Sequence, residues 1–159
     1  MSKIGFIGTG IMGRHMARHL QDGGHELLFC PHRNPTPEEL IAAGGHDCAS
    51  RRELAAQAEV IIMIVPDTPQ VAEVLHGEDG VLAGLKPGKL VIDMSSISPI
   101  ETKDFAARIN ELGCDYLDAP VARVSGLDVP MHYARALEKL IVPDAEAVIR
   151  AFKHVSYLD

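Results

Sequence analysis

The sequence predicts one α/β domain, doubly wound, with a mostly parallel sheet and helices on both faces. Short apolar runs alternate with helix-like segments along most of the chain, which is the pattern of this fold class. The runs at 60–65 and 90–94 are apolar throughout, as in strands that are buried on both faces. The 159 residues suffice for one core and are too few for a second domain of usual size. Right-handed crossovers then place helices on both sides of the sheet.

The first three predicted elements are a strand, a helix and a strand. Residues 3–7 are apolar and bounded by glycine, which indicates a short buried strand. A helix is expected over 12–21, because apolar residues recur every four positions before two glycines end the pattern. Residues 25–30 form the second predicted strand.

Capping residues mark four further helix starts. Thr36-Pro37-Glu38-Glu39 combines a threonine cap, a proline at the first helical position and a glutamate three residues after the cap. Residues 98–101 repeat this arrangement with a serine cap, residues 50–53 repeat the serine cap and the glutamate, and Thr68-Pro69 repeats the first half. Because these starts lie between apolar runs, strand and helix are expected to alternate.

The last quarter of the chain is less regular. Residues 115–118 resemble a strand, and 122–125 are a second candidate. Pro143 opens a predicted helix with apolar residues on one face. Since no linker precedes this part, we expect it to complete the same domain.

The composition limits the partners and the compartment. Fifteen Lys and Arg against 22 Asp and Glu give a net charge of −7, which offers no general attraction for nucleic acid or an anionic membrane. No apolar run approaches the roughly 20 residues of a membrane span. The cysteines, Cys30, Cys48 and Cys114, show no paired spacing, and the chain begins without a leader pattern. We therefore expect a cytoplasmic protein, with no nucleic acid and no membrane as partner.

A glycine-rich motif follows the first strand and opens the first helix. It is a GxGxxG sequence made of Gly8, Thr9, Gly10, Ile11, Met12 and Gly13. In this context the first glycine allows a tight turn, the second lets a pyrophosphate approach the backbone, and the third lets helix and strand pack closely. The motif therefore predicts a dinucleotide site at the N-terminus of the helix.

The segment after the second strand bears on which dinucleotide is bound. An NAD site usually has an acidic residue here, but this chain has Pro31-His32-Arg33-Asn34. Residues His32, Arg33 and Asn34 are predicted to line the adenosine ribose. A guanidinium pairs with a 2′-phosphate, so Arg33 favours NADP(H) over NAD(H). The alternatives are that Arg33 is a solvated charge and that His32 is a bystander.

Two other sets of residues are weaker candidates. Ser95 and Ser96 follow the run 90–94, at the edge of the sheet where such folds bind ligands. They are expected either to contact the nicotinamide ribose or substrate, or only to lead into the next helix. His15 and His19 have a spacing that can bind metal, but no third ligand accompanies them, so no metal site is predicted.

Residues 1 to about 121 resemble the Rossmann-like N-terminal half of the β-hydroxyacid dehydrogenases, namely the 2-hydroxy-3-oxopropionate (tartronate semialdehyde) reductases and 3-hydroxyisobutyrate dehydrogenases. The matching segments are 4–13, 65–69, 93–99 and 117–121. The resemblance implies a nicotinamide cofactor and oxidoreductase chemistry on small hydroxyacids. It implies cofactor contacts at the glycine motif and at Arg33, Val65, Pro66 and Ser95.

The remaining residues depart from that family. Residues from about 115 to 159 resemble the C-terminal end of the β subunit of the thiamine-dependent pyruvate dehydrogenase component, a transketolase C-terminal-like segment. The expectation is a chimera, engineered or natural, with 1–121 as the dinucleotide-binding half and 122–159 as a strand and helix that complete it. The family's catalytic lysine has no counterpart in the matched region, so no catalytic residue is predicted.

Three functions follow from these expectations. The favoured one is a module that binds NADP(H) without turnover. The second is a structural chimera that has lost the ligand site, and the third is a residual semialdehyde reductase, which would need a general acid. The sequence leaves open whether the chain is an enzyme and whether it forms a homodimer.

Overall fold

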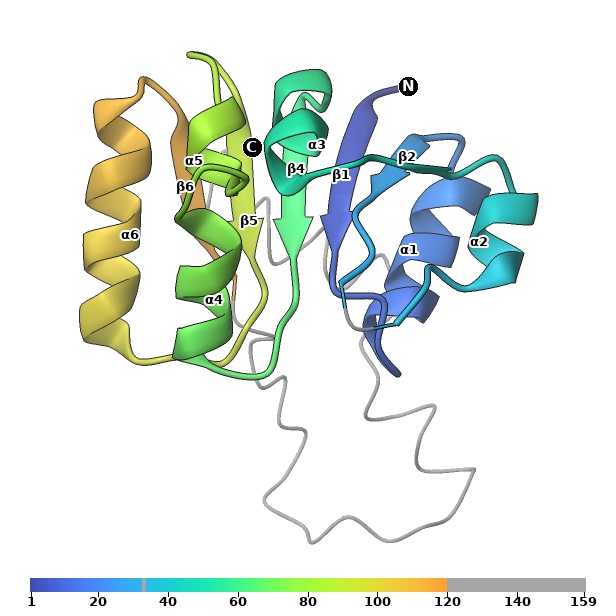
Figure 1. Ribbon diagram of the computed structural model, residues 1–159, viewed down its shortest axis with the longest axis horizontal. Coiled ribbons are helices and arrows are strands. Elements are labelled where there is room, and N and C mark those ends of the chain that lie inside the picture. Colours follow the sequence, from blue (N-terminus) through green and yellow to red (C-terminus); the bar gives the residue numbers. More distant parts are fainter. Residues whose placement is uncertain (33, 120–159) are drawn as a thin grey trace, which may run out of the picture. The chain divides into compact units, whose positions relative to one another are not determined.

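The computed structural model describes residues 1–32 and 34–119. In these residues six parallel strands form one sheet in the order β3-β2-β1-β4-β5-β6 (Figure 1). The strands are β1 (Lys3–Ile7), β2 (Glu26–Phe29), β3 (His46–Asp47), β4 (Val60–Met63), β5 (Leu90–Asp93) and β6 (Asp115–Asp118). The order reverses at β1, which lies between β2 and β4, so the predicted doubly wound fold is confirmed.

Helices cover both faces of the sheet, as expected. They are α1 (Gly13–Asp22), α2 (Glu38–Ala42), α3 (Arg51–Gln57), α4 (Thr68–Leu75), α5 (Val81–Gly84) and α6 (Pro99–Glu111). Side chains of α1 and α2 share one hydrophobic cluster with the sheet, and those of α3 to α6 share the other. The two clusters fall within one compact unit, Met1–Pro120.

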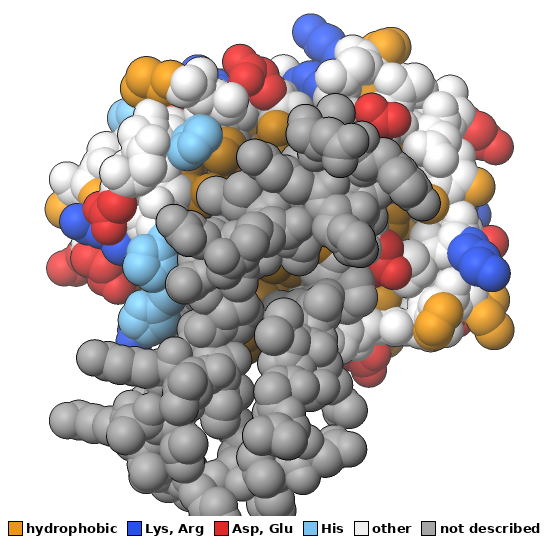
Figure 2. All heavy atoms as spheres, turned by 180° about the vertical axis from the view of Figure 1, so that it is seen from behind, with side chains coloured by type: hydrophobic (Ala, Val, Ile, Leu, Met, Phe, Trp, Pro, Cys, Tyr) orange, Lys and Arg blue, Asp and Glu red, His pale blue; other side chains and the backbone are white. Residues whose placement is uncertain are grey.

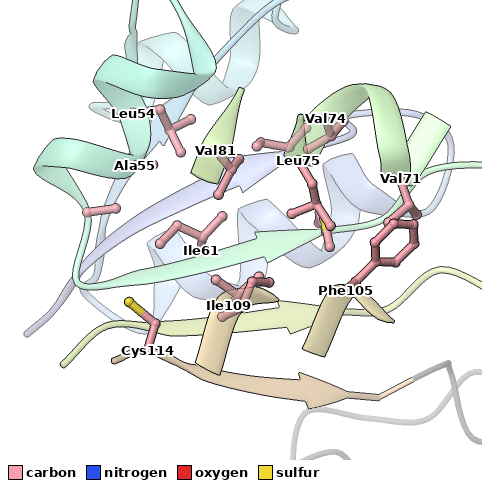
Figure 3. Close-up of a cluster of buried hydrophobic side chains, with 14 of the residues drawn as sticks. Leu54, Ala55, Ile61, Val71, Val74, Leu75, Val81, Phe105, Ile109 and Cys114 are labelled. Carbon is pink, nitrogen blue, oxygen red and sulfur yellow. The ribbon is translucent and has the colours of Figure 1, made fainter. Parts of the chain in front are cut away.

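The larger cluster lies under α3, α4, α5 and α6. Leu54 of α3, Ile61 of β4 and Ile109 of α6 are fully buried in it, as Figure 3 shows. Alternate residues of the same strand face the other cluster: Ile62 packs with Phe6 on the side of α1. Each central strand therefore buries both faces, which explains why these runs lack a polar alternation.

The opposite face is shown in Figure 2. Hydrophobic side chains show both towards the middle and on the rim of this view, among Lys, Arg, Asp, Glu and His side chains. On this side Ile92 and Met94 are only partly buried at the margin of the α1 and α2 cluster. No helix among the described residues is long and apolar enough to cross a membrane.

Two of the four predicted caps are found and two are wrong. The side chains of Ser50 and Ser98 accept backbone N–H groups at the starts of α3 and α6. Thr36 does not cap α2, because its hydroxyl donates to Asp47 Oδ1 at 2.6 Å. Thr68 is the first residue of α4 and Asp67 is its cap, while the Thr68 hydroxyl accepts the Ser98 N–H at 3.3 Å.

Other differences concern short elements and the end of the chain. The sequence did not predict β3 or α5, which have two and four residues. Such short segments carry too few residues for a periodic pattern. The strand expected at 122–125 and the helix expected from Pro143 lie outside the described residues.

Candidate dinucleotide-binding site

The loop between β1 and α1 needs two of its three glycines for the fold itself. Gly8 has a φ of +105°, and a Cβ there would collide with the carbonyl oxygen of Ile64. A Cβ on Gly13 would collide with the carbonyl oxygen of Gly8. These glycines therefore bring β1, β4 and the start of α1 close together.

Gly10 differs from its two neighbours in the motif. A Cβ at this position would meet no protein atom within 4 Å, and its φ is not positive. The fold therefore does not require a glycine at Gly10. The absence of a side chain leaves open space beside the backbone, which is what a pyrophosphate needs for close approach.

The start of α1 is electrostatically suited to an anion. Its cap residue, Met12, supplies no side-chain acceptor, and the first turn contains no acidic residue. The side chains of Thr9, Ile11 and Met12 do not bury the loop: Ile11 is 83% exposed and Met12 54% exposed. The positive end of the helix dipole thus faces the carboxyl edge of the sheet, where it favours an anionic ligand.

The loops after β4 and β5 meet beside this motif. The Val65 N–H donates to Ser95 Oγ at 3.0 Å, and Ser95 is 1% exposed. Pro66 follows Val65 and is exposed. Ser95 thus fixes the Val65 backbone and so shapes the loop after β4. Its neighbour Ser96 is exposed.

A buried carboxylate, which the sequence did not reveal, holds Ser95 in place. Asp93 is fully buried at the end of β5 and accepts the Ser95 N–H at 2.9 Å and the Tyr116 hydroxyl at 2.9 Å. Burial, and then the Asp93 charge, raise the pKa of Tyr116. Burial and Asp93 likewise raise the pKa of Asp118, the neighbour of Asp93 on β6. The network joins the carboxyl ends of β5 and β6 to the loop after β4.

The predicted ribose segment lies at the carboxyl end of β2. His32 and Asn34 are exposed there, while Arg33 lies outside the described residues. Nε2 of His32 is 3.0 Å from Oε1 of Glu73 on α4. The same Glu73 oxygen is 3.1 Å from Nη2 of Arg51 on α3. Sequence reasoning missed this group, because its members lie on three elements and share no motif.

A shallow pocket adjoins this group. It is lined by Cys30, Pro31, Ala49, Ser50, Arg51 and Asp79. Burial raises the pKa of Cys30, the largest of several effects on that thiol. His15 and His19 are exposed on α1, and the described part of the chain contains no group of three residues able to hold a metal ion.

Comparisons with known proteins agree with this geometry. Residues 3–128 match the family described as the NAD binding domain of 6-phosphogluconate dehydrogenase. The 2-hydroxy-3-oxopropionate reductase of Escherichia coli is 50% identical over 120 residues, which are 76% of this chain and 41% of that protein. The 2-(hydroxymethyl)glutarate dehydrogenase of Eubacterium barkeri is 32% identical over an alignment that covers 96% of this chain and 53% of that protein.

A solved structure shows the same relation. The crystal structure of 3-hydroxyisobutyrate dehydrogenase from Salmonella typhimurium matches with a TM-score of 0.65 and 31% identity, over 73% of this chain and 40% of that one. The chain thus spans about half, or less, of the length of these relatives. It belongs to the NAD-binding domain family of 6-phosphogluconate dehydrogenase, and its Rossmann domain resembles that of the β-hydroxyacid dehydrogenases.

Proposed function

We propose that the chain binds a nicotinamide dinucleotide across the carboxyl edge of the sheet. The pyrophosphate contacts the backbone of the motif Gly8 to Gly13, and the adenosine ribose lies at His32 to Asn34. The nicotinamide half lies at Val65 and Pro66, and the buried Ser95 contributes by holding the Val65 backbone. The observation that carries this proposal is the open space at Gly10, in a loop whose other two glycines are required by packing.

The proposed preference is for NADP(H) over NAD(H). It rests on Arg33, whose guanidinium matches a 2′-phosphate in charge and in the geometry of its donors. No acidic residue occurs in the segment 30–34 to accept the ribose hydroxyls of NAD(H). We expect Arg33→Ala to lower the affinity for NADPH more than that for NADH.

The proposed outcome for residues 1–159 on their own is binding without turnover. The bound nicotinamide would supply or accept the hydride, and a reductase also needs a general acid at the developing alkoxide. Among the described lysines, Lys3, Lys86 and Lys89 belong to the amino edge of the sheet, and Lys103 is exposed on α6. Three of these four lysines therefore lie at the edge of the sheet opposite to the proposed nicotinamide site.

Gly10→Val tests the binding proposal. The substitution fills the space that the pyrophosphate would occupy, and no protein atom lies within 4 Å of the new Cβ, so the fold should persist. We expect NADPH and NADH binding, followed by the change in their fluorescence, to weaken at least about tenfold, the effect of roughly 1.4 kcal/mol. Unchanged affinity would refute the assignment of the loop.

A matched control introduces the same side chain elsewhere. Ala43, exposed at the end of α2, lies at the opposite edge of the sheet from the motif. Ala43→Val should leave the affinity for both dinucleotides unchanged. Circular dichroism and the unfolding midpoint of both variants show whether a loss of binding reflects the site or the fold.

A residual reductase is the second candidate activity. The E. coli relative carries the name 2-hydroxy-3-oxopropionate reductase, so that semialdehyde is the substrate to assay with NADPH and NADH. Loss of NADPH absorbance at a rate above that of Gly10→Val would establish turnover. Absence of binding to either dinucleotide would instead leave a structural protein without a ligand site.

The separate origin of residues 122–159 stays a prediction. It is based on the likeness to the pyruvate dehydrogenase β subunit alone. Two findings argue against a separate origin. The family match continues to residue 128, and the alignment with the Eubacterium barkeri enzyme covers 96% of the chain. A homodimer, the other proposed partner assembly, is tested by measuring the mass of the chain in solution.

A further inference from the structure

The ion-pair group at the end of β2 brings a carboxylate to the proposed ribose site. Glu73 Oε1 is 3.0 Å from His32 Nε2 and 3.1 Å from Arg51 Nη2. Arg51 Nη1 also donates to the backbone carbonyl of Glu73 at 3.0 Å. His32 therefore links the Glu73 side chain to the segment that follows β2, and Arg51 of α3 holds both the side chain and the backbone carbonyl of Glu73.

This position matters for the choice of dinucleotide. In doubly wound folds an acidic residue at the end of the second strand accepts the ribose 2′-hydroxyl of NAD(H), and it repels the 2′-phosphate of NADP(H). The segment 30–34 contains no acidic residue. The fold nevertheless supplies a carboxylate at the same place, from a helix that follows β4.

The charge around the proposed ribose site is therefore less positive than the segment 30–34 alone indicates. Arg51 would add to the attraction of Arg33 for a phosphate, but the Glu73 carboxylate pairs with Arg51 and also contacts His32. Arg51 is 17% exposed and Glu73 46% exposed, so the carboxylate remains within reach of a ligand. A 2′-phosphate placed at His32 would meet this negative charge.

We propose that Glu73 is a specificity-determining residue, which opposes Arg33 by lowering the affinity for a 2′-phosphate and accepting a ribose hydroxyl. The inference rests on the proposed function, since it assumes that a dinucleotide binds at this edge. It assigns the preference to two opposing charges that are far apart in the sequence. A sequence motif around Arg33 shows only one of them.

Glu73→Gln tests the proposal on the full chain. The amide keeps the size of the side chain and an acceptor for Arg51, but removes the negative charge. We expect the dissociation constant for NADPH to fall about fivefold at low salt while that for NADH stays equal or rises, because a charge near the surface has an effect of this order. The gain should shrink at high ionic strength.

Two controls separate charge from structure. Glu111→Gln, on an exposed residue at the far end of α6, removes the same charge at a distance and should leave the ratio of the two constants unchanged. Glu73→Asp keeps the charge while altering the contacts, and its ratio should stay close to that of the original chain.

The outcomes distinguish the two proposals. If the unaltered chain binds neither dinucleotide, the proposed function and the inference are both overturned. If it binds them but Glu73→Gln leaves the NADPH-to-NADH ratio within twofold, or if Glu111→Gln shifts the ratio equally, the inference alone is overturned. A selective gain for NADPH in Glu73→Gln alone supports it.

Discussion

At the scale of single residues, Asp93 shows how a buried charge shapes the site. Its carboxylate is fully buried and accepts hydrogen bonds from Ser95 and Tyr116. Asp93→Ala would leave that N–H and that hydroxyl without their acceptor in the core. We expect a loss of about 2–4 kcal/mol in the free energy of unfolding, measured with urea, because each orphaned polar group has a cost.

The matched variant removes one partner only. Tyr116→Phe deletes the hydroxyl but keeps the ring and the Ser95 contact, so a loss of about 1–2 kcal/mol is expected. If Asp93→Ala were no more destabilising than Tyr116→Phe, the bond to Ser95 would not contribute to stability. The loop after β4 would then be held by other contacts.

At the scale of elements, the sequence predicts strands better than caps. The apolar runs at β1, β4 and β5 were found within two residues of their ends, because burial on both faces dictates their composition. The caps at Thr36 and Thr68 were wrong, because those hydroxyls bond Asp47 and Ser98, which are distant in the sequence. Local patterns cannot show such partners.

In the candidate site, too, the local features could be predicted from the sequence and the long-range contacts could not. The glycine motif lies on consecutive residues, and its turn, packing and open space follow from local geometry. Glu73 of α4, Arg51 of α3 and His32 after β2 are far apart in the sequence and meet only in the folded chain. Their identity as a group therefore required the structure.

The contact between α4 and α6 contains a histidine from which we predict how the stability of the fold depends on pH. His76 ends α4, and its ring lies 6.0 Å from that of Phe105 on α6. Burial, and then Arg108, lower the pKa of His76 below its ordinary value of 6.5. The unfolded chain then binds more protons than the folded one, so stability from this group is present above that value and is lost as pH falls through the lowered pKa.

Urea unfolding between about pH 5 and 7 checks this expectation. His76→Gln removes the titrating group, so the decline of stability towards low pH should become shallower. His19→Gln, at an exposed position on α1, is the control and should keep the original slope. Equal slopes in all three proteins would mean that His76 does not contribute to acid sensitivity.

At the scale of the whole molecule, ligand binding and stability are linked. A dinucleotide that binds only the folded chain adds roughly 2.7 kcal/mol at a concentration of 100 times its dissociation constant. For a chain of 159 residues this corresponds to a rise of roughly 5–10 °C in the unfolding midpoint. We expect this rise with NADPH in a thermal scan.

The same scan on variants shows where the added stability originates. Gly10→Val should show a clearly smaller rise with the same NADPH concentration, because the pyrophosphate contacts are lost while the fold persists. Glu73→Gln should show a larger rise than the original chain at equal NADPH, since its dissociation constant is expected to be lower. A rise in Gly10→Val as large as in the original chain would place the ligand elsewhere, and the carboxyl edge would then lose its assignment as the dinucleotide site.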